Sequence, residues 1–398
     1  MLPQLRSNSC RDNTTPEALQ VERILGLCAR AQATPAMACR LAAETDLLLN
    51  WEHLLNRAEH HGLSPLAYWH LKEMDALVPK KTQRALKALY LRHRHANGIR
   101  QRVLVEILSL CGSQDIQVLV LKGAALAFQV YSQPGLRCMR DVDLLVKSSD
   151  AQRTQAMLLK GGFDLFGELS FPSPAGHHHL PILVCQIEGL KVCVEIHDDL
   201  FPATRYYHSQ RFENLSIKAV DFLVGDVPAR TLGYEDMLWH VYRHAIGPPL
   251  LASALRFIHI ADLVSLVEAR YMQIDWERLI QCYPQVYQIL PILHFLTPWS
   301  QPVLDKLHFE TIQTPQQIGL DYQGWPRHRL MGRGHLVDWE VSRQTIAPPE
   351  WWQRLYYGAG CQSAWLWARY IRHPIHLIEW LGHYIREDLS YLIKPEVG

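Results

Sequence analysis

Asp141 and Asp143 lie two residues apart in the apolar run DVDLLV, residues 141–146. Aspartate is depleted in β-strands, so a pair of them in such a run needs a chemical reason. Side chains alternate along a strand, and both carboxylates therefore project from the same face. Two negative charges this close favour a cation between them or a raised pKa on one of them. Carboxylate oxygens suit Mg²⁺ or Mn²⁺.

A third carboxylate stands in a second apolar run, KVCVEIH at residues 191–197. Alternation places Cys193, Glu195 and His197 on one face of this predicted strand. If the two strands are neighbours, Glu195 joins the two aspartates, and three carboxylates on rigid strands form a two-metal site. The alternative is that the aspartates lie at a solvated sheet edge and Glu195 is an ordinary polar-face residue.

The elements that must position these acids are predicted from short β-branched runs and from helical periodicity. Strands are expected at residues 117–121, 141–146, 180–187 and 191–197, and helices at residues 124–130 and 151–160. Gly123 ends the first strand, and Ser148 to Asp150 offer a cap for the second helix. Glu188-Gly189 between the last two strands is a hairpin signal.

Helical patterns flank this central unit on both sides. We therefore predict an α+β protein in which a small mixed β-sheet core is flanked by N-terminal and C-terminal helical regions. The expected divisions are a flexible N-terminus at 1–20, a helical region at 21–112, the α/β core at 113–215, a helical region at 216–300, and an irregular segment with a Trp-rich helical C-terminus at 301–398.

Composition narrows the classes of function. The 398 residues carry 40 Lys and Arg against 39 Asp and Glu, so the chain lacks the basic field of a non-specific nucleic-acid binder and nucleic acid is an unlikely partner. Nine scattered cysteines without a C-x-x-C pair argue against a zinc ribbon or a disulfide framework. With no signal-like segment and no run of about 18 apolar residues, the expected location is the cytoplasm.

Four motifs in combination are more specific than the aspartate pair. In chain order they are LKGAAL at 121–126, PGLR at 134–137, RDVDLLV at 140–146 and VEIH at 194–197. This combination resembles the bacterial nucleotidyltransferase family proteins of the polymerase-β superfamily. Flanking stretches, 51–66 and then 240–276, agree with the same family, so the resemblance spans roughly residues 45–285.

The resemblance implies a catalytic and metal-binding set made of Asp141, Asp143 and Glu195, with Mg²⁺ or Mn²⁺ as the cofactor. The two aspartates are then metal ligands. Glu195 is the third carboxylate, which helps to hold a second metal or accepts the proton of the attacking hydroxyl.

The resemblance also implies a nucleotide-binding set made of Lys122, Gly123, Ala124 and Arg137. A turn glycine that opens a helix lets backbone N–H groups approach a triphosphate. Ala124 departs from the family, which has Ser or Gly there, so a side-chain hydroxyl is lost while the backbone donors remain. Lys122 supplies charge to the phosphates or is a solvent-facing strand end. Arg137 and, less so, Arg140 meet phosphates or pair with the acids, and the alternative for both is a surface ion pair.

The implied activity is transfer of a nucleoside monophosphate from an NTP, with ATP as the first choice, to a hydroxyl or phosphate acceptor with release of pyrophosphate. The acceptor class is open among small molecules, glycans and proteins. The alternative is a catalytically weak or inactive module of the same fold that binds nucleotide or a protein partner in a biosynthetic pathway. Ala124 and the unmatched Trp-rich tail motivate that alternative.

Other histidines and charged residues are interpreted as structural. His177–His179 are expected in a solvated loop, with a substrate contact or one histidine near the carboxylates as the alternative. His197 is expected to be a satisfied strand-end histidine, although a base or a partner of the acids is the other interpretation. His240 and His244 share a helix face and are expected to pack rather than bind zinc. Structural ion pairs are expected for Arg256 and Asp262.

The C-terminal aromatic residues are expected to pack against the helical region. They are Trp351, Trp352, Trp365, Trp367 and Trp380. The alternatives are a partner surface or association with an anionic membrane surface through Arg369, Arg372 and Arg386.

Overall fold

The computed structural model describes residues 16–74, 76–166, 178–201, 210–246, 256–307, 346–348, 350–357, 359, 361–379 and 381–382. At the N-terminal end it contains α1 (Pro16–Leu27), α2 (Pro35–Asp46), α3 (Trp51–His61), α4 (Ser64–Glu73) and the long α5 (Lys80–Ser113). The Asn50 side chain caps α3 by accepting the His53 N–H, and Gly62 ends it at φ +71°. Residues 16–20, which were expected to belong to a flexible N-terminus at 1–20, lie in α1, and residues 1–15 lie outside the described part of the chain.

A mixed seven-stranded sheet forms the centre of the protein, in the order β3-β4-β5-β2-β1-β7-β6. The strands are β1 (Val118–Val120), β2 (Asp141–Val146), β3 (Asp164–Leu165), β4 (Leu183–Ile187), β5 (Leu190–His197), β6 (Val220–Val224) and β7 (Val227–Thr231). The pairs β2–β5 and β1–β7 are parallel, and the other neighbours are antiparallel. This sheet between helical regions confirms the predicted α+β class.

The predicted core elements are found within a few residues of their expected bounds. The helical pieces of the core are α6 (Lys122–Gln129), η2 (Pro134–Leu136), α7 (Ser148–Lys160), α8 (Phe212–Leu215) and η3 (Ser216–Lys218). The β4–β5 hairpin turns at Glu188 and Gly189, whose φ values are +51° and +78°. Two positive φ values in a two-residue loop suit the right-handed twist of a hairpin.

The β6–β7 hairpin corrects the expectation that residues 216–300 are helical. Strand β7 pairs with β1, and β6 pairs with β7 at the edge. The sheet therefore continues beyond residue 215, where the core was expected to end. The turn uses Gly225 at φ +61°. The strands are only five residues long and Pro228 interrupts one of them, which hides the alternation that predicts a strand. The other divisions of the chain stay predictions.

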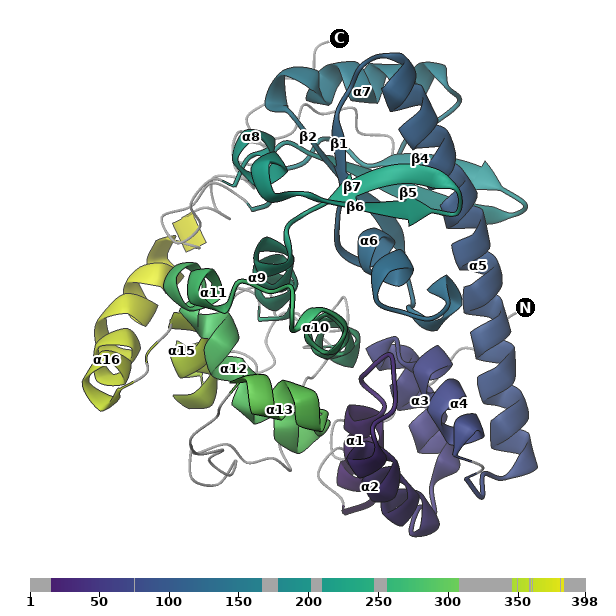
Figure 1. Ribbon diagram of the computed structural model, residues 1–398, viewed down its shortest axis with the longest axis vertical. Coiled ribbons are helices and arrows are strands. Elements are labelled where there is room, and N and C mark those ends of the chain that lie inside the picture. The colour runs from purple at the N-terminus through teal and green to yellow at the C-terminus, as the bar shows by residue number, and fades with distance from the viewer. Residues whose placement is uncertain are drawn as a thin grey trace.

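The C-terminal helices lie together on one side of the sheet (Figure 1). They are α9 (Tyr234–Ala245), α10 (Phe257–Arg270), α11 (Trp276–Cys282), α12 (Pro284–Leu296), α13 (Gln301–Leu307), α15 (Glu350–Tyr357), α16 (Gln362–Trp367) and η6 (Ala368–Arg372). Trp365 is buried as expected, whereas Trp367 is 59% exposed. The side chains of Trp351, Trp352 and Trp380 and the residue Arg386 lie outside the described part of the chain. Among the helices that the structure describes, none combines the length and apolarity needed to cross a bilayer.

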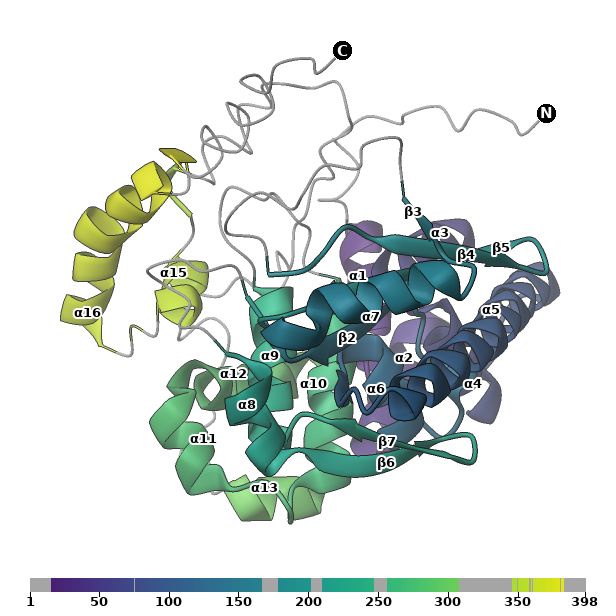
Figure 2. The same ribbon diagram turned by 90° about the horizontal axis from the view of Figure 1, so that it is seen from above.

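Two hydrophobic clusters meet along α5, which runs down one side of the molecule from the sheet to α1–α4, opposite α16 (Figures 1 and 2). Its first half gives Leu86 and Tyr90 to the helical cluster, and its second half gives Val103 and Ile107 to the sheet cluster. One face of β2 packs in this second cluster through Val142, Leu144 and Val146. The other face, which carries the aspartates, looks toward α9 and α10, because Leu145 belongs to the helical cluster with their residues. The eight cysteines in the described ranges are free thiols.

Candidate active site

Strands β2 and β5 bring the predicted acids together. They pair in parallel with Asp141 opposite Cys193 and Asp143 opposite Glu195. Residues opposite one another in a sheet project to the same face, so Asp141, Asp143 and Glu195 share one face as expected. The alternative of a solvated edge does not hold for β2, because it lies between β5 and β1.

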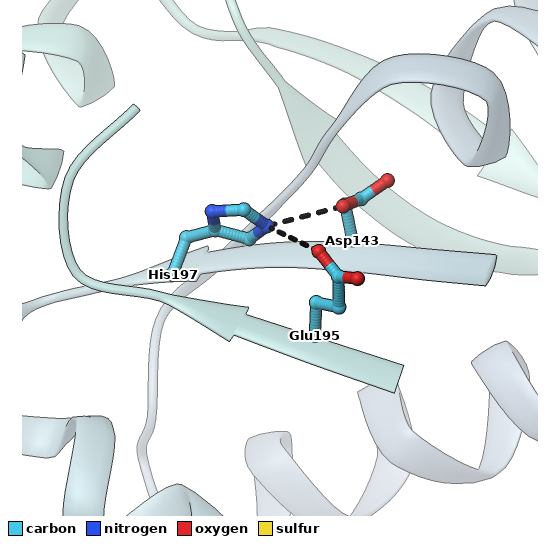
Figure 3. A group of neighbouring side chains, drawn as sticks. All are labelled: Asp143, Glu195 and His197. Carbon is cyan, nitrogen blue, oxygen red and sulfur yellow. Dashed lines mark hydrogen bonds and ion pairs between the residues drawn. The ribbon is translucent and has the colours of Figure 1, made fainter. Parts of the chain in front are cut away.

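Asp143, Glu195 and His197 form a compact cluster (Figure 3). Nε2 of His197 lies 3.1 Å from Oδ1 of Asp143 and 3.5 Å from Oε2 of Glu195. One ligand atom from each of the three lies within 4.8 Å of the others. Asp143 and His197 are buried, while the Glu195 side chain is 20% exposed and can meet a substrate.

His197 was expected to be a satisfied strand-end histidine, and the structure places its Nε2 against two of the acids, which is the contact that the other interpretation requires. Its position two residues after Glu195, on the same strand face, is the sequence signal that could have identified it. The other ring nitrogen, Nδ1, is buried and has no hydrogen-bond partner within the described ranges. The imidazole is thus oriented by the acids rather than by a surrounding hydrogen-bond network.

Lys122 reaches the same carboxylate from the end of β1. Its Nζ lies 2.9 Å from Oδ1 of Asp143. The Leu121 N–H donates to the Asp143 carbonyl at 2.9 Å, which fixes the start of α6 beside β2. Lys122 itself has φ +47°, a left-handed conformation that non-glycine residues rarely adopt. The alternative of a solvent-facing strand end is thus wrong for this side chain.

The two aspartates have opposite pKa shifts. Burial and the negative charge of Asp143 raise the pKa of Asp141 to about 6. Burial also acts to raise the pKa of Asp143, but Lys122 and the hydrogen bond from His197 hold it well below its ordinary value. Asp143 therefore stays ionised, while Asp141 exchanges a proton near neutral pH.

The two cationic neighbours of Asp143 have raised pKa values. For Lys122 the attraction of Asp143 outweighs the effect of burial, which acts to lower the pKa. For His197 the hydrogen bonds to Asp143 and Glu195 likewise outweigh burial. Both groups thus favour their protonated forms beside the acids.

The side chain of Arg137 lies against the turn at Gly123. A Cβ on Gly123 would lie 2.2 Å from Nη1 of Arg137, so the glycine is needed to make room for that guanidinium. Arg137 is buried, and its Nη2 donates to Oδ2 of Asp262 at 2.6 Å. Ala124 is also buried, in the sheet cluster. The nucleotide-binding roles predicted for Lys122, Gly123, Ala124 and Arg137 stay predictions.

Asp262 forms the structural ion pair that was expected for it, whereas Arg256 makes a hydrogen bond to a backbone carbonyl. Asp262 binds Arg137 as above, and it also accepts a hydrogen bond from the Tyr131 hydroxyl at 2.8 Å. Arg256 instead donates from Nε to the His60 carbonyl at 3.1 Å. Arg140 is exposed, and the described part of the chain gives it no acidic partner.

His178 and His179 correct the expectation of a solvated loop. Both are half-buried, and their rings lie 5.2 and 5.5 Å from the ring of His197, measured between centroids. His179 is held there by a β-bridge to His197. The two rings therefore lie beside His197, which itself contacts the acids. His177 lies outside the described residues.

The helices facing the acids supply further histidines. Burial and the charge of Lys122 hold the pKa of His240 well below its ordinary value and lower that of His244 to about 4. His240 packs against the Phe201 ring at 5.5 Å, and His244 against the His259 ring at 4.7 Å. Within the described residues neither belongs to a cluster that could hold a metal.

The arrangement fits a divalent cation. Two carboxylate oxygens and an imidazole nitrogen converge on rigid strands, and the carboxylate of Asp143 stays charged. The oxygen of Asp143 that does not face His197 points away from the imidazole and can serve as a second ligand atom (Figure 3). Such a site can organise and neutralise phosphate groups.

Comparison with known proteins gives one family and several solved structures. Residues 48–283 match the family described as uncharacterised nucleotidyltransferase. No curated protein matches the chain.

The similar solved structures cover about half of this chain. They include the crystal structure of ANT(2″)-Ia in complex with adenylyl-2″-tobramycin (TM-score 0.33, 13% identity, 48% of this chain and 98% of that one). The solution structure of the antibiotic-resistance factor ANT(2″)-Ia gives a TM-score of 0.33 at 14% identity over 50% of this chain and 98% of that one. An antigenic nucleotidyltransferase-like protein from Paracoccidioides brasiliensis gives 0.31 at 14% identity over 52% and 96%.

Proposed function

We propose that this chain, which belongs to the uncharacterised nucleotidyltransferase family, transfers a nucleoside monophosphate from an NTP to a hydroxyl or phosphate acceptor in a metal-dependent reaction. Pyrophosphate is the second product, and ATP is the first NTP to test. The observation that carries the proposal is the direct pairing of Asp143 with Glu195 across parallel strands, next to the glycine turn that opens α6.

Each side chain then has a distinct task. Asp143 and Glu195 would hold a divalent ion with Asp141 beside them, and His197 would join them as a ligand if the ion displaces the proton on its Nε2. The bound ion would neutralise charge on the transferred phosphoryl group. Glu195, whose side chain is 20% exposed, can also accept the proton of the attacking hydroxyl. The backbone N–H groups at the start of α6 would bind the triphosphate, because the first N–H groups of a helix lack partners within it.

The proposal is tested by following pyrophosphate release from each of the four NTPs with Mg²⁺ or Mn²⁺ across small-molecule, glycan and protein acceptors. Asp143→Asn should lower the rate by about 100-fold or more, since it removes a charge that the reaction uses. Asp164→Asn is the matched control, because Asp164 is an exposed residue of the edge strand β3. Equal rates for wild type and Asp143→Asn would refute the assignment.

Ala124 supports one alternative, a nucleotide-binding module without turnover. The side chain is 2% exposed within the sheet cluster, so this position offers the phosphates no side-chain donor. The alternative predicts that NTPs raise the melting temperature while no acceptor yields pyrophosphate. Pyrophosphate release that depends on Asp143 would exclude it.

A further inference from the structure

The Lys122 ammonium is part of the acidic cluster. Its Nζ contacts the same oxygen of Asp143, Oδ1, that Nε2 of His197 contacts at 3.1 Å. The Asp143 side chain is 3% exposed and the Lys122 side chain 18%, so this contact is shielded from water far more than a surface ion pair. The charge of Lys122 therefore belongs to the electrostatic balance of the site.

The backbone holds Lys122 in this place. Leu121 continues the hydrogen bonding of β1 to β2, with its N–H on the Asp143 carbonyl, and the next residue turns into α6 at φ +47°. A left-handed conformation at a lysine persists only where the surrounding structure imposes it. The ammonium thus approaches Asp143 from a fixed point rather than from a flexible surface segment.

The groups that already contact Asp143 limit how many metal ions fit. Oδ1 of this carboxylate has the Lys122 ammonium at 2.9 Å and Nε2 of His197 at 3.1 Å. A second divalent ion on the same carboxylate would lie next to a buried ammonium, where the low dielectric makes repulsion strong.

We propose that Lys122 takes the place of one of the two divalent cations expected from the acids, so that the site binds one metal ion in its nucleotide complex. This inference rests on the proposed function and adds the metal stoichiometry to it. An ammonium has three donors, so the bond to Asp143 leaves two for phosphate oxygens. Lys122 can therefore bridge Asp143 to the triphosphate as a metal ion would.

The test counts Mn²⁺ bound per full-length chain by equilibrium dialysis, with the non-hydrolysable α,β-methylene-ATP at equal concentration on both sides and bound nucleotide counted in parallel. Wild type should bind one Mn²⁺. Lys122→Met should bind two, because the competing charge is gone, while Lys122→Arg should still bind one. Lys160→Met, which removes an exposed lysine of α7, is the control and should bind one.

Two results would overturn the inference: two Mn²⁺ ions on wild type, or a single ion on a folded Lys122→Met with unchanged affinity. Lys122→Arg keeps the test decisive if Lys122→Met does not fold, since an arginine variant that binds two ions also contradicts it. A wild-type chain that takes up no Mn²⁺ at all would instead defeat the proposed function, and the two failures are therefore distinguishable.

Discussion

At the scale of single residues, two neighbouring aspartates of one strand are given different chemistry by their surroundings. Asp143 has Lys122 and His197 within hydrogen-bond distance and stays ionised. Asp141 lacks such contacts within the described residues and lies half-buried beside the charge of Asp143, so its pKa rises to about 6. The consequence can be measured on the metal-free protein.

Asp141→Asn should stabilise the metal-free protein at high pH. A carboxyl whose pKa is higher in the folded than in the unfolded chain binds its proton more tightly when folded, so the free energy of unfolding falls as pH rises from about 4 to about 6 and stays low above that range. The amide removes this loss, on the order of 2 kcal/mol at pH 8 and little below pH 4.

Urea unfolding in EDTA at pH 4 and pH 8 measures the difference. Asp164→Asn, on the exposed edge strand, should leave the free energy of unfolding unchanged at both values of pH. An Asp141→Asn protein less stable than wild type at pH 8 would show that burial does not disfavour this charge.

His197→Ala should weaken Mn²⁺ binding by about 10- to 100-fold, as expected for a group that contacts two acids of the site. His95→Ala is the control, because His95 is exposed and lies 4.0 Å from Glu188, away from the cluster. Titration calorimetry at pH 7.5 measures both affinities. Unchanged binding in His197→Ala would mean that the imidazole neither ligates the metal nor orders the carboxylates.

At the scale of elements, the turn from β1 into α6 is built around a buried arginine. Gly123→Ala would place a methyl group 2.2 Å from Nη1 of Arg137 and 2.6 Å from its Cζ. We expect a loss of stability of about 1–3 kcal/mol, because the guanidinium must leave its position on Asp262.

Gly98→Ala gives the matched comparison. Gly98 is exposed on α5, and a Cβ there meets nothing within 4 Å, so alanine should be neutral or stabilising by about 0.5–1 kcal/mol. Thermal and urea unfolding compare the two. A Gly123→Ala chain as stable as wild type would show that the glycine serves something other than Arg137.

Local sequence patterns predicted some of these elements and missed others. Strand β2 and the β4–β5 hairpin were predictable because alternation and a turn glycine are local signals. The short β6–β7 hairpin was missed, since tertiary pairing with β1 stabilises it more than its own pattern does. The partner of Arg137 lies 125 residues further along the chain, and no local pattern reports such a contact. Alternation grouped Asp141 with Asp143 and Glu195 with His197, whereas the contact of His197 with Asp143 depends on the pairing of β2 with β5, which no local pattern reports.

At the scale of the whole molecule, the sheet is connected to the helices of the N-terminal and C-terminal regions, which together form the helical half. Helix α5 runs from the sheet to α1–α4 (Figure 1), and it contributes residues to both hydrophobic clusters. The Arg137–Asp262 pair joins the loop before β2 to α10. The Asp262 carboxylate also accepts a hydrogen bond from the Tyr131 hydroxyl.

Breaking this pair should destabilise the whole protein. Asp262→Ala leaves the Arg137 charge buried without its acid, at a cost of about 3–5 kcal/mol. Replacing both partners, as Arg137→Met with Asp262→Leu, should cost less than Asp262→Ala alone, because no unpaired charge remains. Glu188→Ala, which breaks the exposed pair with Arg102, is the control and should leave the free energy of unfolding almost unchanged. Urea unfolding compares these variants with wild type, and an Asp262→Ala protein as stable as Glu188→Ala would mean that the Arg137–Asp262 pair does not hold the two halves together.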